Sequence, residues 1–211
     1  MDFVKSEKKY FNLAFGLALF TIFYNILEGV VALYFGYEDE SLALFGFGAD
    51  SFIEVISGLG IVHMITRIKH NPHSNRDRFE KTALRITGVA FYLLTAGLVV
   101  SSVYNIWTGH TPDTTFWGLV ISVVSIIMMW ALVWGKRKAG HELNSEPILA
   151  DANCTLVCLY MSIVLLLSSG IYELTGIGFI DSLGGLCLAW FSFSEGRECF
   201  EKINSDKYCS C

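Results

Sequence analysis

Six apolar stretches, separated by short polar segments, dominate the pattern of hydrophobic and polar positions along this chain. They cover residues at about 10–36, 41–66, 83–108, 115–135, 147–172 and 177–196. A helix needs roughly 20 predominantly apolar residues to cross a bilayer, and each stretch reaches that length. The pattern therefore predicts an all-α membrane protein with six transmembrane helices. The connecting segments are too short to fold by themselves, so residues 1–211 are expected to form a single transmembrane domain.

The positive charges lie on one side of a bilayer when these stretches are threaded through it in order. All 15 lysines and arginines fall on that side, whereas the segments on the other side hold only acids: Glu38, Asp39, Glu40, Asp113 and Glu173. Basic loops stay on the cytoplasmic face, so both termini are expected in the cytoplasm, in a multi-pass protein of the inner or plasma membrane. The same threading leaves carboxylates inside the membrane with no lysine or arginine partner. Intramembrane acids are functional candidates because they are costly to bury.

Composition agrees with a membrane protein. The chain is 53% hydrophobic and 17% charged, with a mean hydropathy of +0.50. Pro72 and Pro112 fall between stretches and Pro147 falls in the first turn of the fifth, so we expect no helix to be interrupted by proline. The first stretch is too long for the apolar part of a signal peptide and shows no convincing small-residue cleavage site, so it is expected to be retained.

Two acids in the second stretch carry the strongest chemical signal. Asp50 and Glu54 are four residues apart, so they lie on one face of a helix, one turn above the other. Asp50 is expected near the middle of the bilayer. Two carboxylates at that depth repel each other unless a proton or a cation lies between them. The alternative is a protonated, hydrogen-bonded pair that only holds helices together.

The fifth stretch offers a matching face with two thiols. Cys154 and Cys158 are also four residues apart, and this helix runs antiparallel to the second. If the two faces meet, Cys158 comes level with Asp50 and Cys154 with Glu54. Two carboxylates and two thiolates suit zinc or softer metals such as cadmium, with Asp151 as an auxiliary ligand or relay. The alternative role for each cysteine is that of a small buried hydrophobe.

Several other polar residues are secondary candidates. Asn25 and Glu28 lie on the first stretch and either line an outward vestibule or cap a helix contact. Asp181 is expected at the membrane interface. Three histidines around the second cytoplasmic loop, His63, His70 and His73, either gather metal or belong to a solvated loop, and His110 and His141 are interpreted as surface residues. The terminal Cys209 and Cys211 resemble a metal-capturing pair, with a frayed or lipidated terminus as the alternative reading.

With these motifs the chain resembles the cation diffusion facilitators. That family has six transmembrane helices with cytoplasmic termini, and its metal site pairs an Asp/His-xxx-Asp motif on the second helix with His/Asp-xxx-Asp on the fifth. Asp50-xxx-Glu54 matches the first motif, and Cys154-xxx-Cys158 occupies the place of the second. Similar family features are Ser41-Leu-Ala-Leu, Asn25-xxx-Gly29 and Ala150-Asp151. The resemblance implies a cation-efflux-like bundle, a homodimer, and export of metal by proton antiport.

The chain departs from the family pattern in two places. Family transporters usually continue into a folded cytoplasmic domain, whereas only about fifteen residues follow the sixth stretch here, so the chain resembles a transmembrane-only branch. Thiols also replace the acid-plus-histidine pattern of the fifth helix. This removes the histidine that would help to couple proton movement, and leaves that role to Asp151 or Glu54.

These observations predict a secondary transporter, not an enzyme, that moves divalent cations such as zinc, cadmium or iron(II) and needs no cofactor. The absence of a nucleotide-binding P-loop argues against direct coupling to ATP, and nothing points to nucleic acid. Two alternatives from other classes remain. One is a membrane metal sensor or partner subunit that binds the ion without moving it. The other is a membrane thiol oxidoreductase that uses Cys154 and Cys158.

Overall fold

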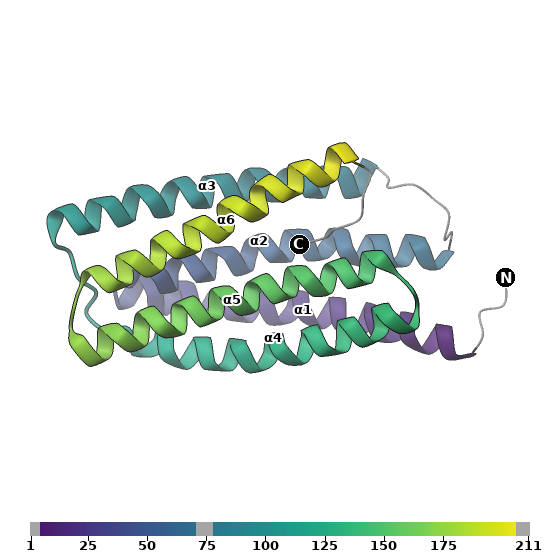
Figure 1. The fold of residues 1–211 in the computed structure, drawn as a ribbon, viewed down its shortest axis with the longest axis horizontal. Coiled ribbons are helices and arrows are strands. Elements are labelled where there is room, and N and C mark those ends of the chain that lie inside the picture. The colour runs from purple at the N-terminus through teal and green to yellow at the C-terminus, as the bar shows by residue number, and fades with distance from the viewer. Residues whose placement is uncertain (1–4, 71–77, 206–211) are drawn as a thin grey trace.

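The chain folds into six long helices that run side by side along one direction (Figure 1). The computed structural model describes residues 5–70 and 78–205. The helices are α1 (Lys5–Glu38), α2 (Leu42–His70), α3 (Arg78–Thr108), α4 (Phe116–Glu142), α5 (Glu146–Thr175) and α6 (Phe179–Ser205). The described residues contain no strand, which confirms the all-α prediction and the order of the six predicted elements.

Five of the six helices, α1 to α5, are long and apolar enough to cross a membrane within the described residues. The helix α6 is also long, but its second half is rich in charged residues. The sixth span predicted at 177–196 therefore stays a prediction. Some helices extend beyond the predicted apolar stretches. For example, α4 ends at Glu142, whereas the predicted stretch ends at 135.

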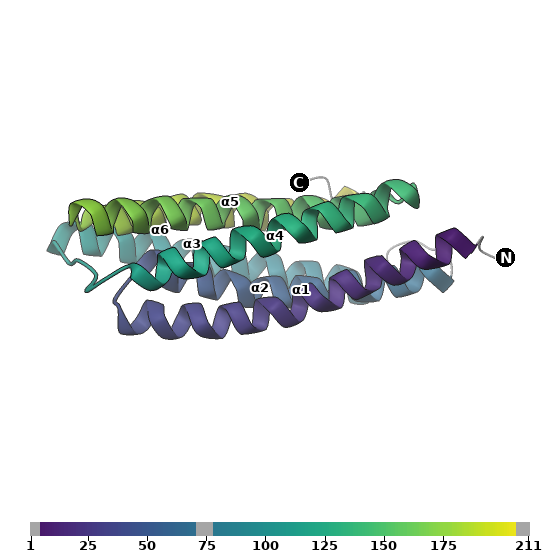
Figure 2. The ribbon, with the colours of Figure 1, turned by 90° about the horizontal axis from the view of Figure 1, so that it is seen from below.

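The helices pack as a closed ring in the order α1, α2, α3, α6, α5 and α4, and α2 also contacts α5 across the interior. Figure 2 shows α1 and α2 on one side of the bundle and α5 with α6 on the other. At one end, which we name the acidic end, lie the connections α1–α2, α3–α4 and α5–α6. At the opposite, basic end lies the α4–α5 connection. The acidic-end half holds the main apolar cluster, built from buried residues such as Ala43, Leu44, Phe47, Leu165 and Leu188.

The ends of α5 follow from its local sequence, and they set the height of the thiols. Pro147 occupies the first turn, where a missing N–H costs little. Gly176 closes the helix with φ 65, a left-handed conformation in which glycine is favoured, and its N–H donates to the Tyr172 carbonyl. The helix is continuous between these points, as expected from the absence of internal proline.

Close helix contacts through glycine predict a sharp difference between two substitutions. A Cβ at Gly48 would lie 2.7 Å from the Leu33 backbone nitrogen and 3.0 Å from Ala32 Cβ, so α1 and α2 would have to separate. We expect Gly48→Ala to destabilise the protein by about 1–3 kcal/mol, as overpacking does. At Gly97 nothing lies within 4 Å of the added atom, so Gly97→Ala should be neutral or slightly stabilising. Thermal unfolding in detergent measures both, and equal shifts would contradict close α1–α2 packing at this point.

Candidate functional site

A cavity with mainly apolar walls and several polar side chains occupies the interior of the bundle and receives residues from all six helices. Asp50 lies at its deep end, and the cavity extends from there toward the basic end of the bundle, past Glu54, Cys154 and Lys202. Both predicted motif pairs therefore line one cavity. The packed apolar cluster lies on the other side of Asp50, in the acidic-end half.

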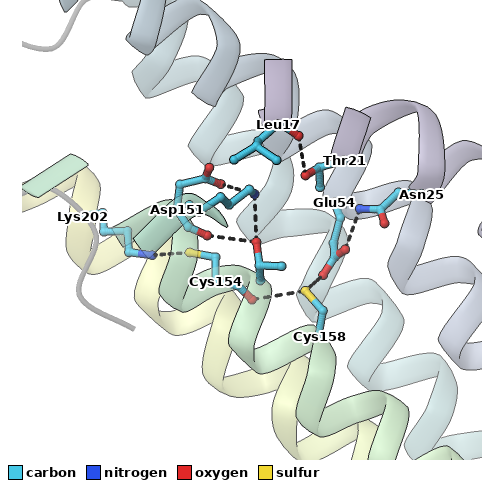
Figure 3. A network of polar contacts seen from close by, with 10 residues as sticks. Leu17, Thr21, Asn25, Glu54, Asp151, Cys154, Cys158 and Lys202 are labelled. Carbon is cyan, nitrogen blue, oxygen red and sulfur yellow. Dashed lines mark hydrogen bonds and ion pairs between the residues drawn. The ribbon is translucent and has the colours of Figure 1, made fainter. Parts of the chain in front are cut away.

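The two acids of α2 have different surroundings. The Asp50 side chain is only 3% exposed, and no hydrogen-bond donor among the described residues reaches its Oδ1. Glu54, one turn farther toward the basic end, accepts a 2.7 Å hydrogen bond from Asn25 Nδ2 and contacts the thiol of Cys158 (Figure 3). Asp50 thus presents an unsatisfied oxygen to the cavity, whereas Glu54 is tied to α1 and α5.

Of the two candidates on α1, only Asn25 lines the cavity. Asn25 is fully buried, and its amide nitrogen donates to Glu54. No donor in the described part of the chain reaches its amide oxygen, Oδ1. Glu28 lies one turn away, outside the lining of the cavity, and accepts hydrogen bonds from Tyr24 and Ser51. The amide oxygen of Asn25 is therefore a second unsatisfied acceptor in the same cavity as Asp50.

The thiols of α5 are shifted by one helical turn from the predicted register. Cys158 contacts Glu54 and not Asp50, and it also donates to the Cys154 carbonyl at 3.1 Å. Cys154 lies 3.9 Å from Lys202 Nζ on α6 (Figure 3). The prediction that Cys154 lies level with Glu54 was wrong because the register of two antiparallel helices depends on their tertiary packing. No disulfide joins the two cysteines.

The expectation that the intramembrane acids have no cationic partner was also wrong. Lys136 is only 2% exposed, and its Nζ lies 3.0 Å from Asp151 Oδ1 and 2.8 Å from Thr155 Oγ1. The sequence analysis placed this lysine in a cytoplasmic loop. Lys136 in fact continues the buried face of α4 in register with Met129 and Leu132, and this helical spacing was the signal that would have identified it.

A second lysine, Lys202 on α6, lines the same cavity. Its Nζ lies 2.9 Å from Glu198 Oε1, one turn earlier on the same helix. Two ammonium groups therefore lie at the basic end of the cavity, each beside a carboxylate.

The polar groups of the cavity are close together in pairs. Among the described residues, no three histidine, cysteine, aspartate or glutamate side chains are grouped closely enough to hold a metal ion. Two such pairs are Glu54 with Cys158 and Lys136 with Asp151. The predicted ligands Asp50, Glu54, Cys158, Cys154 and Asp151 thus line one cavity without forming a ready-made coordination shell.

Asp181 has a structural role that the sequence analysis missed. It is buried and accepts hydrogen bonds from the Ser41 hydroxyl at 2.7 Å and from the backbone N–H groups of Leu42 and Ala43. These N–H groups belong to the first turn of α2, where helical N–H groups lack intrahelical acceptors. Asp181 of α6 therefore caps α2 from another helix, and its expected place at the membrane interface stays a prediction.

The histidine and terminal cysteine candidates lie away from the cavity or outside the described residues. His70 Nδ1 lies 2.8 Å from the Thr66 carbonyl on an exposed surface, and His110 pairs with Glu40 at 3.1 Å. His73, Cys209 and Cys211 lie outside the described residues.

The acidic end carries negative charge in its connecting segments, as the sequence predicted. The Asp113 N–H donates to the Asp39 carbonyl at 3.0 Å, so two of these segments meet. Partial burial and the nearby Asp113, Glu38 and Glu173 carboxylates raise the pKa of Asp39. Such a concentration of negative charge attracts cations.

Comparison with known proteins agrees with the motifs. Residues 14–203 match the family described as the cation efflux transmembrane domain. The chain is also 24% identical over 169 residues to a protein of Methanocaldococcus jannaschii named uncharacterized transporter MJ0449. That match covers 78% of this chain and 59% of the relative's length. The family match covers part or all of each of the six helices and both motif pairs, and it extends well beyond half of the chain. The chain therefore belongs to the cation efflux family, a family of multi-pass membrane transporters and not of enzymes.

Proposed function

We propose that this protein carries divalent metal cations across the membrane and binds them at Asp50 and Glu54. The observation that carries the proposal is the Asp50 carboxylate, which is buried in the cavity with an oxygen that no described donor reaches. A buried polar atom without a partner is unfavourable, and a buried charge more so. A bound cation would supply the missing partner.

The donor atoms around Asp50 define the class of metal. Oxygen atoms come from Asp50, Glu54 and the unsatisfied Oδ1 of Asn25, and sulfur comes from Cys158. A mixed oxygen and sulfur set suits zinc, cadmium and iron(II), whereas manganese and magnesium prefer oxygen alone. Cys154 and Asp151 lie nearer the basic end of the cavity, so we assign them to an earlier point on the path of the ion.

The shape of the cavity supports access from the basic end. The cavity reaches Lys136 and Lys202 there, whereas the acidic-end half is filled by the apolar cluster around Leu44 and Leu165. We propose that the basic end faces the cytoplasm, because basic segments stay on that side. The structure then corresponds to an inward-facing state, and transport needs a second state in which the apolar cluster opens and the basic end closes.

Metal flux into liposomes tests this function. The purified protein is reconstituted with a zinc-sensitive dye inside, and its orientation is determined by impermeant labelling of cysteines placed at Asp113 and at Asn144. We expect zinc to enter only when protein is present, and Asp113→Cys to be labelled from the face opposite to Asn144→Cys. Zinc binding without flux would instead identify a metal sensor, and labelling of both positions from one face would overturn the threading.

Two serine substitutions test which thiol binds the ion. Cys158 contacts Glu54, so we place its sulfur at the proposed metal site. Loss of a residue that only supports a metal ligand lowers metal affinity by roughly 10- to 100-fold. Loss of a ligand should cost at least as much, so Cys158→Ser should weaken cadmium binding by at least that factor. Manganese binding should change little, because manganese does not depend on sulfur. Cys154→Ser is the matched control and should have the smaller effect, since Cys154 lies beside Lys202. Competition binding of cadmium and manganese measures both variants, and an equal loss in the two would contradict the assignment.

A further inference from the structure

A further carboxyl group lines the cavity, and it comes from a helix that carries neither motif pair. Glu195 lies on α6, and the wall of the cavity includes it together with Cys199 and Lys202 of the same helix. These three residues are spaced four and three apart, so they lie on one face of the helix. Ser192, three residues before Glu195, is fully buried. Glu195 therefore belongs to the face that α6 turns toward the interior of the bundle.

The cap that Asp181 provides to α2 gives the height of Glu195 in the bundle. Asp181 accepts a 2.7 Å hydrogen bond from the Leu42 N–H, so the first turns of α2 and α6 lie at one level. Both helices run from the acidic end toward the basic end (Figure 1). At 1.5 Å per residue, Glu54 lies about 18 Å along α2 from Leu42, and Glu195 lies about 21 Å along α6 from Asp181. Glu195 is therefore close to the level of Glu54.

The Glu195 carboxylate has no direct partner in the described part of the chain. No hydrogen bond or ion pair with a described residue holds it, although the side chain is only partly exposed. The ammonium group of Lys202 lies 2.9 Å from a different acid, Glu198. A carboxylate that leaves water without gaining a partner is unfavourable. Glu195 shares this property with Asp50, whose buried Oδ1 no described donor reaches.

A cation in the cavity would satisfy both acids. Glu195 is near enough to Asp50 and Glu54 for their negative charges to repel one another. An opposite charge between like charges turns that repulsion into attraction. In the ring of helices α6 lies opposite α1, which contributes the unsatisfied Oδ1 of Asn25. A carboxylate from α6 would thus approach the ion from the side of the bundle opposite to Asn25.

We propose that Glu195 is a further metal-binding residue, which binds the divalent cation from α6 together with Asp50 and Glu54. No three side chains of this kind converge within the described residues, so the Glu195 side chain turns toward Glu54 when the ion binds. A third carboxylate adds negative charge to the site, which strengthens the preference for divalent over monovalent cations. The inference rests on the proposed function, and it adds a ligand from a helix that neither motif pair includes.

Replacement by cysteine tests direct contact between residue 195 and the ion. Cobalt(II) takes the ligands of zinc, and each thiolate that binds it adds a charge-transfer band in the near ultraviolet. We expect the reduced Glu195→Cys protein to bind cobalt(II) with a stronger band than the wild type. Glu198→Cys is the matched control, because Glu198 lies on the same helix but outside the lining of the cavity, and it should leave the band unchanged. An equal gain of intensity in both variants would overturn direct contact.

The zinc affinity separates a ligand from a neighbour of Lys202. Glu195→Gln keeps the shape but removes the charge. It should weaken zinc binding by at least the roughly 10- to 100-fold that follows loss of a residue that only supports a metal ligand. Glu198→Gln removes the 2.9 Å partner of Lys202 and should weaken zinc binding less. Calorimetry measures the affinities, and thermal unfolding in detergent checks that the variants are folded.

Two outcomes of the affinity measurement would contradict the proposal in distinguishable ways. An equal loss in Glu195→Gln and Glu198→Gln, or no loss in Glu195→Gln, would overturn the role of Glu195 alone, provided that Asp50→Asn still abolishes zinc binding. If Asp50→Asn bound zinc as tightly as the wild type, the proposed function itself would fail.

Discussion

Asp50→Asn is expected to abolish metal transport, reducing zinc flux to the level of protein-free liposomes. The substitution keeps the size of the side chain but removes the charge from the buried oxygen that no described donor reaches. Asparagine offers one neutral oxygen and one N–H₂ group to the cavity, and an N–H₂ group cannot bind a cation.

The variant should remain folded. Asp50 lies beside Glu54, and loss of one of two neighbouring like charges removes repulsion, so the thermal stability in detergent should be unchanged or higher. Asp113→Asn is the control for flux because it removes an exposed carboxylate at the acidic end, far from the cavity. Full zinc transport by a folded Asp50→Asn protein would refute the site.

The helices were predictable from the sequence because the bilayer imposes a length on apolar stretches. In the structure, Pro112 lies in the connection between α3 and α4, and Gly176 lies at the end of α5, where the connection to α6 begins. The positions of the charged residues at the basic end were predicted less well. Lys136 was assigned to a loop because positive residues mark cytoplasmic segments, yet its spacing from Met129 and Leu132 placed it on the buried face of α4. At this position helical periodicity was a better guide than charge.

The contents of the cavity were predictable, but the pairing of its side chains was not. Spacing of four residues placed Asp50 and Glu54 on one face of α2, and the two thiols on one face of α5, and all four line the cavity. The register between the helices depends on packing across the whole bundle, so the contact of Cys158 with Glu54 could not be derived from either motif. The cap that Asp181 provides to α2 joins residues 140 positions apart, and no local pattern indicates such a contact.

The buried pair of Lys136 and Asp151 gives the second large expected effect, this time on stability. In Lys136→Met, Asp151 would keep its charge in the interior with its ammonium partner removed. Breaking a buried ion pair in this way typically costs about 3–5 kcal/mol, because an uncompensated charge remains. In the double variant Lys136→Met, Asp151→Asn both charges are gone, so most of that loss should be recovered. Thermal unfolding in detergent measures the single and double variants, and additive losses would show that the two side chains act independently.

Arg197→Met is the matched control for this cycle. Arg197 pairs with Glu201 at 3.2 Å, but both side chains are largely exposed, and exposed pairs contribute only about 0–1 kcal/mol.

The Lys136→Met variant and the double variant also test Asp151 as an auxiliary metal ligand. With Lys136 removed, the Asp151 carboxylate is available to a cation, so zinc should raise the unfolding temperature of Lys136→Met more than that of the wild type, since a ligand stabilises the state that it binds. The double variant lacks that carboxylate and should lose the additional zinc effect. An equal effect of zinc on the unfolding temperatures of Lys136→Met and the double variant would show that Asp151 does not bind zinc and only pairs with Lys136.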